Sequence, residues 1–265
     1  SRRQRQMCIR DRYIATPHNS HYDYAKKAIV TGKHVLVETP MVLLGFQAKE
    51  LFKMAEERGV ILMEANKTAH CPAFNHLIVM IKSGVIGEVV DIEASVSQLL
   101  DKSGREFDPN QSGGALYEQG SSVLLPMVKL LGTECRNINI YSRMENGVDI
   151  YTKGVLRYDH AICSFKAGLG VKTEGNLVIS GTKGYAYVPA PWWKTDYFEL
   201  RYEDQNKNRK FFYKWDGAGL RYEIQEFISC IVNKRFSTAR LRRRESIWIA
   251  DVMEQFQTRK NVMEI

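Results

Sequence analysis

The segment from Tyr13 to Pro40 constrains the fold of this chain more than any other part of the sequence. A short apolar run at residues 13–15 leads through a polar loop to a periodic helical pattern over residues 22–30, which ends before Gly32, where a helix C-cap belongs. A second apolar run follows at residues 35–37. A strand, a helix and a second strand in this order form one repeat of a parallel sheet, so we predict an α/β fold.

The composition is that of a globular protein. The 265 residues are 44% hydrophobic, which suffices for one large core or two modest ones. No window approaches about 18 uninterrupted apolar residues, and the N-terminus lacks the apolar stretch of a signal peptide, so we expect a cytoplasmic protein without a membrane partner. The five cysteines are scattered and never form a CxxC pair, which argues against a disulfide framework and against a metal site.

The formal charge of +8 raises the question of a nucleic-acid partner, but the charge is unevenly distributed. Residues 1–12 hold five Arg against one Asp, and four more Arg lie within residues 240–244. No stripe of basic and aromatic residues accompanies either cluster, so nucleic-acid binding is not predicted. Residues 1–12 also lack strand alternation and an amphipathic face. We interpret them as a non-native basic segment, and a genuine basic arm is the alternative.

Downstream of Pro40 the pattern predicts helices and one strand, and then a strand-rich region. Helices are expected at residues 44–58 and 73–83, and a strand at residues 60–64. Later strands are expected at residues 89–97, 137–141, 149–158, 161–166, 175–180 and 185–188. An apolar helix after the Gly-Gly segment is expected to run through Leu131-Gly132, and two more helices are expected at residues 220–233 and 244–257. This order predicts an α+β domain at residues 73–265 with a large open, mostly antiparallel sheet.

Four stretches of the sequence resemble the Gfo/Idh/MocA family of NAD(P)-dependent sugar and inositol oxidoreductases. They are TPHNSH at residues 16–21, Glu38-Thr39-Pro40, KSGVIGEV at residues 82–89 and GTKGYAYVPAPWWKT at residues 181–195. The similarity extends over nearly the whole chain from about Arg12, and the last stretch is similar to a subgroup close to dihydrodiol dehydrogenase. The resemblance implies NAD or NADP as cofactor, a C-terminal domain for substrate binding and oligomerisation, and a homodimer or higher homo-oligomer.

One element of a dinucleotide-binding fold is not found. Such a fold opens with a strand, a G-x-G-x-x-G turn and a helix, and no such motif precedes Tyr13. We therefore expect a partial Rossmann-type parallel sheet that lacks its first strands, in a dinucleotide-binding domain over residues 13–72. The pyrophosphate part of the NAD or NADP site would then be incomplete in this chain.

The resemblance assigns the cofactor contacts to the ends of the first two strands. The residues that match the family's loop along the nicotinamide ribose are Thr16, Pro17, Asn19 and His21. Glu38 matches the acid that contacts a ribose, and Pro40 completes the family's Glu-Lys-Pro pattern beside it. Thr16 and Pro17 also fit an ordinary turn that ends a strand.

The sequence departs from the family pattern at the proton-handling positions. Thr39 replaces the lysine of Glu-Lys-Pro, and Ser122 replaces a His or Tyr acid/base. Neither hydroxyl titrates usefully near neutral pH. Glu118 lies one helical turn before Ser122, so both face the same side of a helix. Lys67, at the end of the adjacent strand, is our candidate for the missing lysine, and a structural or substrate-orienting cation is the alternative.

Other candidates are less specific. Tyr117 and His70 can titrate, although a lone histidine is typically a structural residue. Trp192 and Trp193, with Lys194, are candidates for a wall on which a sugar stacks, and a buried aromatic pair or a subunit contact is the alternative.

Two functions follow. The first is a fragment of an NAD(P)-dependent oxidoreductase that acts on a hydroxyl or carbonyl of a sugar, inositol or related polyol. The second is a non-catalytic family member that binds a ligand or a partner subunit, with its proton-handling groups lost to Thr39 and Ser122.

Overall fold

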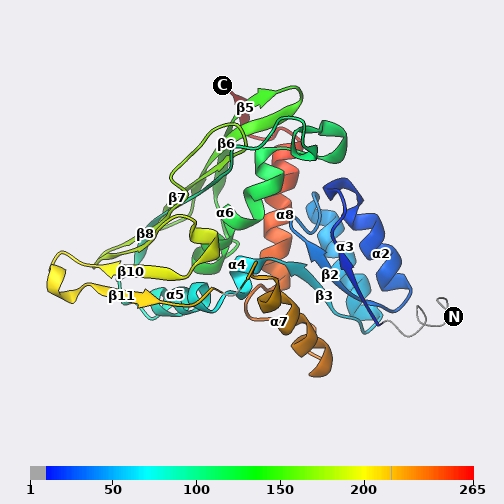
Figure 1. The fold of residues 1–265 in the computed structure, drawn as a ribbon, viewed down its shortest axis with the longest axis horizontal. Coiled ribbons are helices and arrows are strands. Elements are labelled where there is room, and N and C mark those ends of the chain that lie inside the picture. Colours follow the sequence, from blue (N-terminus) through cyan, green and yellow to red (C-terminus); the bar gives the residue numbers. More distant parts are fainter. Residues whose placement is uncertain (1–9, 216) are drawn as a thin grey trace.

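The computed structural model describes residues 10–215 and 217–265. A small parallel sheet holds three strands in the order β1 (Asp11–Ile14), β2 (His34–Glu38) and β3 (Leu62–Ala65). The helices α2 (His21–Val30) and α3 (Gly45–Glu57) cover one face of it (Figure 1). The strand-helix-strand repeat expected from the sequence is therefore present.

The other face of the small sheet is covered by α7 (Leu220–Val232). Phe227 and Cys230 of this helix pack on Leu36 and Met63, whose neighbours along each strand point to the opposite face. A helix from the C-terminal part of the chain thus completes the core around the first sheet, although the sequence assigned it to the domain at residues 73–265. Helical periodicity identifies an apolar face but does not indicate which sheet that face packs on.

The large sheet holds nine strands in the order β11-β10-β9-β8-β4-β7-β6-β5-β12. The strands are β4 (Val89–Ser97), β5 (Asn137–Glu145), β6 (Val148–Arg157), β7 (Ile162–Gly168), β8 (Leu177–Gly181), β9 (Tyr185–Val188), β10 (Tyr197–Arg201), β11 (Arg209–Phe212) and β12 (Val262–Glu264). Only the pairs β4–β7 and β5–β12 are parallel among these described strands. The predicted class, a Rossmann-type parallel sheet followed by a mostly antiparallel open sheet, is confirmed.

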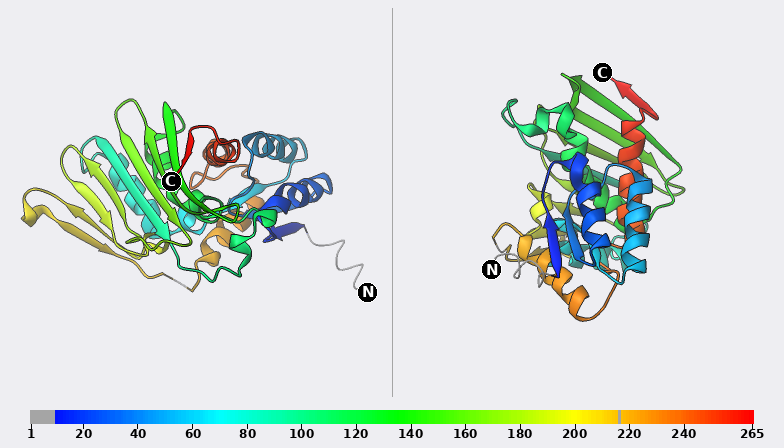
Figure 2. Two further views of the ribbon diagram at one scale, coloured as in Figure 1. Left: turned by 90° about the horizontal axis from the view of Figure 1, so that it is seen from above. Right: turned by 90° about the vertical axis from the view of Figure 1, so that its right-hand side faces the viewer.

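Four further helices among the described residues pack on the large sheet or between the two sheets. The helices are α4 (Lys67–His70), α5 (Pro72–Lys82), α6 (Ala115–Leu131) and α8 (Arg243–Gln257). Figures 1 and 2 show α6 on the large sheet and α8 between α6 and α3. A Cβ atom at Gly120 of α6 would lie 2.4 Å from Met253 Cε of α8, so a larger residue at this position would displace the end of the Met253 side chain.

Short 3-10 turns connect these elements. They are η1 (His18–Ser20), η2 (Arg105–Phe107), η3 (Pro109–Gln111), η4 (Trp192–Lys194) and η5 (Gln205–Lys207). The turns η1, η2 and η4 contribute residues to the cavities described below, and η3 follows η2 in the same loop.

Some elements differ from the sequence prediction. β10, β11 and β12 were not predicted, because polar residues separate β10 from β11 and β12 has only three residues. Of the segment predicted to be non-native, residues 1–9 lie outside the described residues, whereas Asp11 and Arg12 belong to β1. They pair with His34 and Val35 of β2, so the first strand begins two residues before the predicted start at Tyr13.

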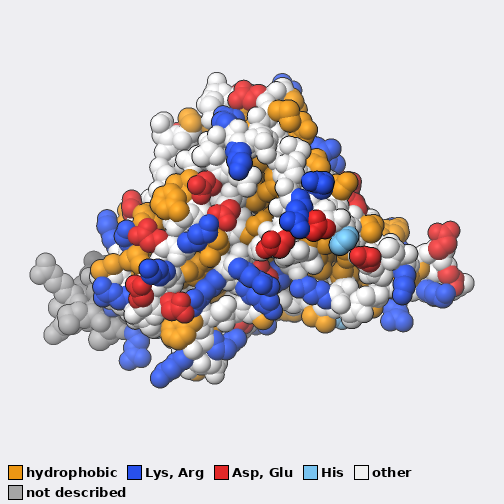
Figure 3. All heavy atoms as spheres, turned by 180° about the vertical axis from the view of Figure 1, so that it is seen from behind, with side chains coloured by type: hydrophobic (Ala, Val, Ile, Leu, Met, Phe, Trp, Pro, Cys, Tyr) orange, Lys and Arg blue, Asp and Glu red, His pale blue; other side chains and the backbone are white. Residues whose placement is uncertain are grey.

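Basic and acidic side chains are interspersed over the face of the molecule seen in Figure 3. No helix within the described part of the chain is long and apolar enough to cross a membrane. The four cysteines that the structure describes are free thiols, and no three His, Cys, Asp or Glu among the described residues gather as metal ligands.

Candidate functional site

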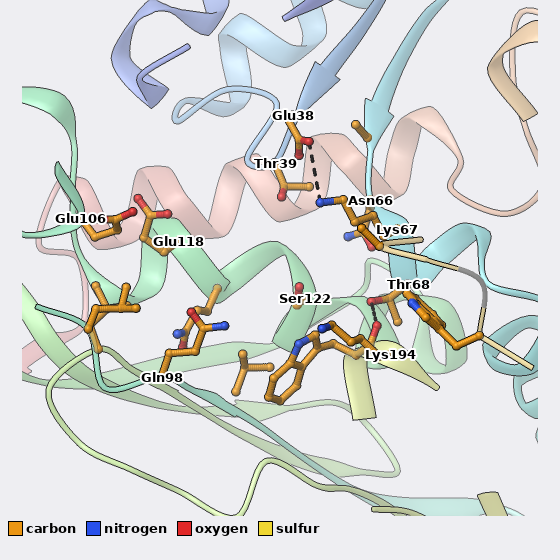
Figure 4. Close-up of a pocket in the computed structure, with 18 residues that line it drawn as sticks. Glu38, Thr39, Asn66, Lys67, Thr68, Gln98, Glu106, Glu118, Ser122 and Lys194 are labelled. Carbon is orange, nitrogen blue, oxygen red and sulfur yellow. Dashed lines mark hydrogen bonds and ion pairs between the residues drawn. The ribbon is translucent and has the colours of Figure 1, made fainter. Parts of the chain in front are cut away.

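A cavity of ≈ 410 Å³ lies between the two sheets. The ends of β2 and β3 line one side of it, and α6, the end of β4 and η4 line the other (Figure 4). Its polar lining residues are Glu38, Thr39, Asn66, Lys67, Thr68, Gln98, Glu106, Glu118, Gln119, Ser122 and Lys194. The volume falls within the range of about 300–1,000 Å³ that is typical of small-molecule sites, and α/β sheets bind ligands at the carboxyl ends of their strands.

A second cavity of ≈ 390 Å³ shares part of this lining. The residues common to both cavities are Glu38, Thr39, Lys67 and Glu118. The second cavity extends toward the loop after β1, where its lining residues are Ala15, Thr16, Pro17, His18 and His21, together with Arg105. The predicted cofactor side and the predicted substrate side therefore meet at the ends of β2 and β3.

Lys67 lies at the junction of the two cavities. Its Nζ is 3.9 Å from Oε1 of Glu38, and Figure 4 shows its side chain extending toward Glu38 and Thr39. The hydroxyl of Tyr13 donates a hydrogen bond to the same oxygen of Glu38. Glu38 is thus held from two sides, and the ammonium of Lys67 is kept beside Thr39, the position where the family resemblance expects a lysine.

Asn66 determines where Lys67 lies. Its Oδ1 accepts a hydrogen bond from the backbone N–H of Ala69 at 3.1 Å and so caps the one-turn helix α4 that begins with Lys67. Its Nδ2 donates to the carbonyl of Ser121 at 3.3 Å. One buried carboxamide therefore joins the end of β3 to α6, next to Ser122.

Glu64 of β3 contacts both the loop after β2 and helix α6. This residue of β3 is 2% exposed, and its Oε1 accepts hydrogen bonds from Met41 N at 3.4 Å and from Ser121 Oγ at 3.2 Å. Burial raises the pKa of its carboxyl, although these hydrogen bonds oppose the shift. Glu64 thus fixes the distance between the loop after β2 and helix α6.

The carboxylate of Glu118 is bound by Arg105. Arg105 binds both of its carboxylate oxygens, at 2.9 and 3.1 Å, and His18 Nδ1 lies 3.6 Å from Oε1. Burial raises the pKa of Glu118, and the nearby Arg105 opposes this. Burial, together with Arg105, lowers the pKa of His18 to about 4, so the ring is neutral at physiological pH. Arg105 and His18 were not predicted, because they come from loops without a motif for this contact.

Two of the predicted cofactor residues, Asn19 and Pro40, do not face a cavity. Asn19 Nδ2 donates to the carbonyl of Asn110 at 2.8 Å and lines neither cavity, and buried Pro40 also lines neither. His21 lines the second cavity, but its ring nitrogens contact the carbonyl oxygens of Thr16 at 2.7 Å and Pro40 at 2.9 Å. His21 therefore connects two loops. Thr16 and Pro17 line the second cavity as predicted residues of this loop.

The two tryptophans predicted to form one aromatic wall lie in different environments. Trp192 is completely buried in the large core, packs against Phe74 and donates its indole N–H to Ser95 O at 2.9 Å. Trp193 and Lys194 line the first cavity. Consecutive residues of a 3-10 turn point in different directions, so only one of the two tryptophans can face the cavity.

Tyr117 and His70 line neither cavity. Tyr117 packs edge-on against Phe256, and burial raises its pKa to about 12. His70 is completely buried, and neither of its ring nitrogens has a hydrogen-bond partner within the described residues. Burial lowers its pKa to about 4. The structure thus does not bring these two titratable groups to the cavity that holds Lys67.

Gln98 and Gln119 were also missed by sequence reasoning. Gln119 exchanges two hydrogen bonds with the backbone of Gly168, at 2.8 and 3.0 Å, and so attaches α6 to β7. Gln98 follows the last residue of β4 and is exposed in the cavity. No local pattern indicates that either glutamine lines a site.

Comparison with known proteins agrees with this architecture. Residues 7–66 match the profile of an oxidoreductase family with an NAD-binding Rossmann fold, and residues 74–187 match the Gfo/Idh/MocA C-terminal domain. The rabbit (Oryctolagus cuniculus) trans-1,2-dihydrobenzene-1,2-diol dehydrogenase is 28% identical over 252 residues, which cover 92% of this chain and 76% of that protein. A dTDP-3,4-didehydro-2,6-dideoxy-alpha-D-glucose 3-reductase of Actinomadura kijaniata is 31% identical over 66% of this chain and 52% of its own length.

Solved structures share the fold. KijD10, a 3-ketoreductase from Actinomadura kijaniata solved with NADP and TDP-benzene, superposes with a TM-score of 0.84 at 21% identity, over 96% of this chain and 78% of that one. GnnA, a UDP-N-acetylglucosamine 3-dehydrogenase from Acidithiobacillus ferrooxidans, superposes with a TM-score of 0.76 at 18% identity, over 94% and 77%. The chain described here belongs to the Gfo/Idh/MocA family of NAD(P)-dependent oxidoreductases.

Proposed function

We propose that this protein oxidises a hydroxyl or reduces a carbonyl of a sugar, inositol or related polyol, with Lys67 as the group that exchanges the proton. The observation that carries the proposal is the position of the Lys67 ammonium, 3.9 Å from Glu38, at the junction of the two cavities beside Thr39. A lysine from the end of β3 thereby reaches the place that the family pattern assigns to the residue after Glu38.

The lining of the second cavity supports it as the proposed site for the nicotinamide half of NAD(P). It lies at the carboxyl ends of β1 and β2, and it offers the hydroxyl of Thr16 and the carboxylate of Glu38, both suited to ribose hydroxyl groups. The chemistry that NAD(P) supplies when bound is hydride transfer to or from the carbon that carries the reacting oxygen. Thr16, Pro17 and Glu38 are therefore our proposed cofactor contacts.

The residues of the chain would handle the proton and the substrate orientation. In oxidation the amine form of Lys67 takes the hydroxyl proton, and in reduction its ammonium returns a proton to the carbonyl oxygen. Glu38 keeps Lys67 oriented, while the hydroxyls of Thr39 and Ser122 can bind further substrate oxygens. Trp193 offers an aromatic surface in the same cavity.

The test is activity on a polyol panel with NAD⁺ and NADP⁺. Lys67→Met should lower kcat/KM by about 10² to 10⁴, the usual contribution of a general acid or base. Lys53→Met, an exposed position on α3, is the matched control and should leave the activity unchanged. Full activity in Lys67→Met would exclude the proton-handling role.

A second function, ligand binding without catalysis, is favoured by Thr39 and Ser122. Both hydroxyls line the cavity and neither can act as an acid or base near neutral pH. A protein that binds a polyol and the cofactor yet turns over no member of the panel would support this alternative.

We also propose that the face of the large sheet opposite α6 joins copies of this chain. That face carries Asp91 and Glu93 on β4 beside Lys153 on β6 and Lys166 on β7, a distribution in which two copies can pair opposite charges. Val155 lies among them, and Val155→Arg should convert the oligomer into a monomer in light scattering. An unchanged mass would place the contact elsewhere.

A further inference from the structure

Lys194 introduces a second lysine into the first cavity. Figure 4 shows the side chains of Lys67 and Lys194 extending into the same space from opposite segments. Lys67 lies 3.9 Å from Glu38, whereas no ion pair joins Lys194 to an acid among the residues that the structure describes. The remaining acids of the cavity are turned to Arg105, which binds Glu118 at 2.9 Å and lies 4.0 Å from Glu106.

The backbone around Lys194 is fixed. The buried indole of Trp192 anchors η4 through its 2.9 Å hydrogen bond to Ser95 O, and Thr195 Oγ1 donates to Trp192 O at 2.6 Å. Thr68 Oγ1 donates to Trp193 O at 2.7 Å. Because Thr68 follows Lys67 and Trp193 precedes Lys194, this hydrogen bond holds the two lysine-bearing segments side by side.

An ammonium group in a cavity attracts an anionic substituent of a ligand. The carboxylate of Glu38 compensates the positive charge of Lys67 but makes no ion pair with Lys194. The charge of Lys194 is therefore available to a ligand, next to the aromatic surface of Trp193 and within the cavity that contains the proposed proton-exchanging group.

We infer that the cavity takes a substrate with an anionic substituent, a carboxylate or a phosphate, and that Lys194 binds this substituent while the reacting oxygen lies at Lys67. The inference rests on the proposed function, since it narrows the substrate of the same cavity to sugar acids or sugar phosphates. Lys194 is then a specificity-determining residue and takes no part in proton exchange.

Binding can be measured without turnover, because Trp193 and Trp215 line the cavity and report on its occupation by their fluorescence. The probes are D-glucuronate, D-glucose 6-phosphate and D-glucose, titrated into the wild type, Lys194→Gln, Lys194→Arg and the control Lys53→Gln. At least one anionic probe should bind about tenfold tighter than D-glucose, as expected for hydrogen bonds to a charged group. The anion that binds tighter identifies the substituent as carboxylate or phosphate.

Lys194→Gln should abolish this preference with an unchanged melting temperature, because the side chain is exposed. Lys194→Arg and Lys53→Gln should retain it. Equal binding of the three probes, no binding of either anion, or a preference that survives in Lys194→Gln would overturn the inference.

The same experiment separates this inference from the proposed function. Anions that bind through Lys194 but are never turned over leave the anion site standing and count against the oxidoreductase activity. Turnover of neutral polyols at rates that do not change in Lys194→Gln, with no preference for an anionic probe, would support the oxidoreductase activity and would exclude the anion site at Lys194.

Discussion

The carboxamide of Asn66 donates its N–H to the carbonyl of Ser121 at 3.3 Å while its oxygen accepts the backbone N–H of Ala69 at 3.1 Å. Asn66 is 3% exposed, so both hydrogen bonds are shielded from water. The residue that caps the turn carrying Lys67 is thus also the residue that holds this turn against α6. The separation between Lys67 and Ser122 depends on a side chain that need not touch the substrate.

Asn66→Asp tests this dual role. An aspartate still caps α4 but cannot donate to Ser121 O, and its charge faces a carbonyl oxygen. We expect a loss of about 1–3 kcal/mol of unfolding free energy, the usual cost of an unsatisfied buried polar group, and a larger fall in kcat than in the affinity for the cofactor. Denaturant unfolding and steady-state kinetics measure the two effects.

The control for Asn66→Asp is Asn208→Asp. Asn208 is exposed, and its side-chain oxygen accepts a hydrogen bond from Tyr202 N at 2.8 Å, which an aspartate retains. Its stability should stay within about 0.5 kcal/mol of the wild type. An Asn66→Asp protein with wild-type stability and kcat would show that the contact to Ser121 has no role in positioning.

Substitutions that restore the family's lysine at position 39 test whether Lys67 has taken over its role or whether that role is missing. In a Lys67→Met background, Thr39→Lys should restore part of the activity, because the cavity then regains one ammonium beside Glu38. Thr39→Lys with Ser122→His in the otherwise native protein should raise dehydrogenase activity by about 10² to 10⁴ if proton handling is the only deficiency. Rates on the polyol panel measure both.

Activity of the native protein that Lys67→Met abolishes, with cofactor binding intact, would assign the role to Lys67. No activity from either the native or the repaired protein, with the cofactor bound in both, would favour the non-catalytic function.

Glu223 makes the stability depend on pH. It is completely buried on α7, and neither carboxylate oxygen has a hydrogen-bond partner among the described residues. Burial, reinforced by Glu38 and opposed by Lys67, raises its pKa from 4.5 to about 8. The folded protein therefore keeps a proton that the unfolded chain releases, so the contribution of Glu223 to stability is complete below about pH 4.5 and is lost as the pH rises through about 8.

Glu223→Gln removes this dependence. The variant and the wild type should differ least near about pH 5, and the variant should be more stable by at least about 1 kcal/mol near about pH 9, since one pKa unit corresponds to about 1.4 kcal/mol. Denaturant unfolding across this range measures the difference. Glu57→Gln, at an exposed position of α3, should show no such trend, and a constant difference for Glu223→Gln would contradict the assigned pKa.

Trp192 and Trp193 should respond differently to truncation. Trp192→Ala removes a completely buried side chain from the large core and should cost about 3–5 kcal/mol of unfolding free energy. Trp193→Ala should cost much less stability and should weaken binding of a sugar to the cavity that it lines. Denaturant unfolding and ligand titration measure the two effects, and equal losses of stability would contradict the division of the pair.

The sequence by itself determined the features that depend on local periodicity. The strand at residues 89–97 was predicted with the bounds that the structure gives, because apolar residues alternate along it. The end of the apolar helix at Leu131, before Gly132, was predicted as well. Thr16, Glu38, Thr39 and Lys67 were placed together for a related reason, since each lies at the carboxyl end of a parallel strand and such ends share one edge.

The tertiary structure decided which distant segments meet. Arg105 with Glu118, Asn66 with Ser121 and Thr68 with Trp193 are contacts made by side chains whose partners no local pattern specifies. The assignment of α7 to the small sheet and the burial of Trp192 beside a Trp193 that faces the cavity were decided in the same way. Periodicity reports which side of an element is apolar, whereas the partner of that side is selected by the packing of the whole chain.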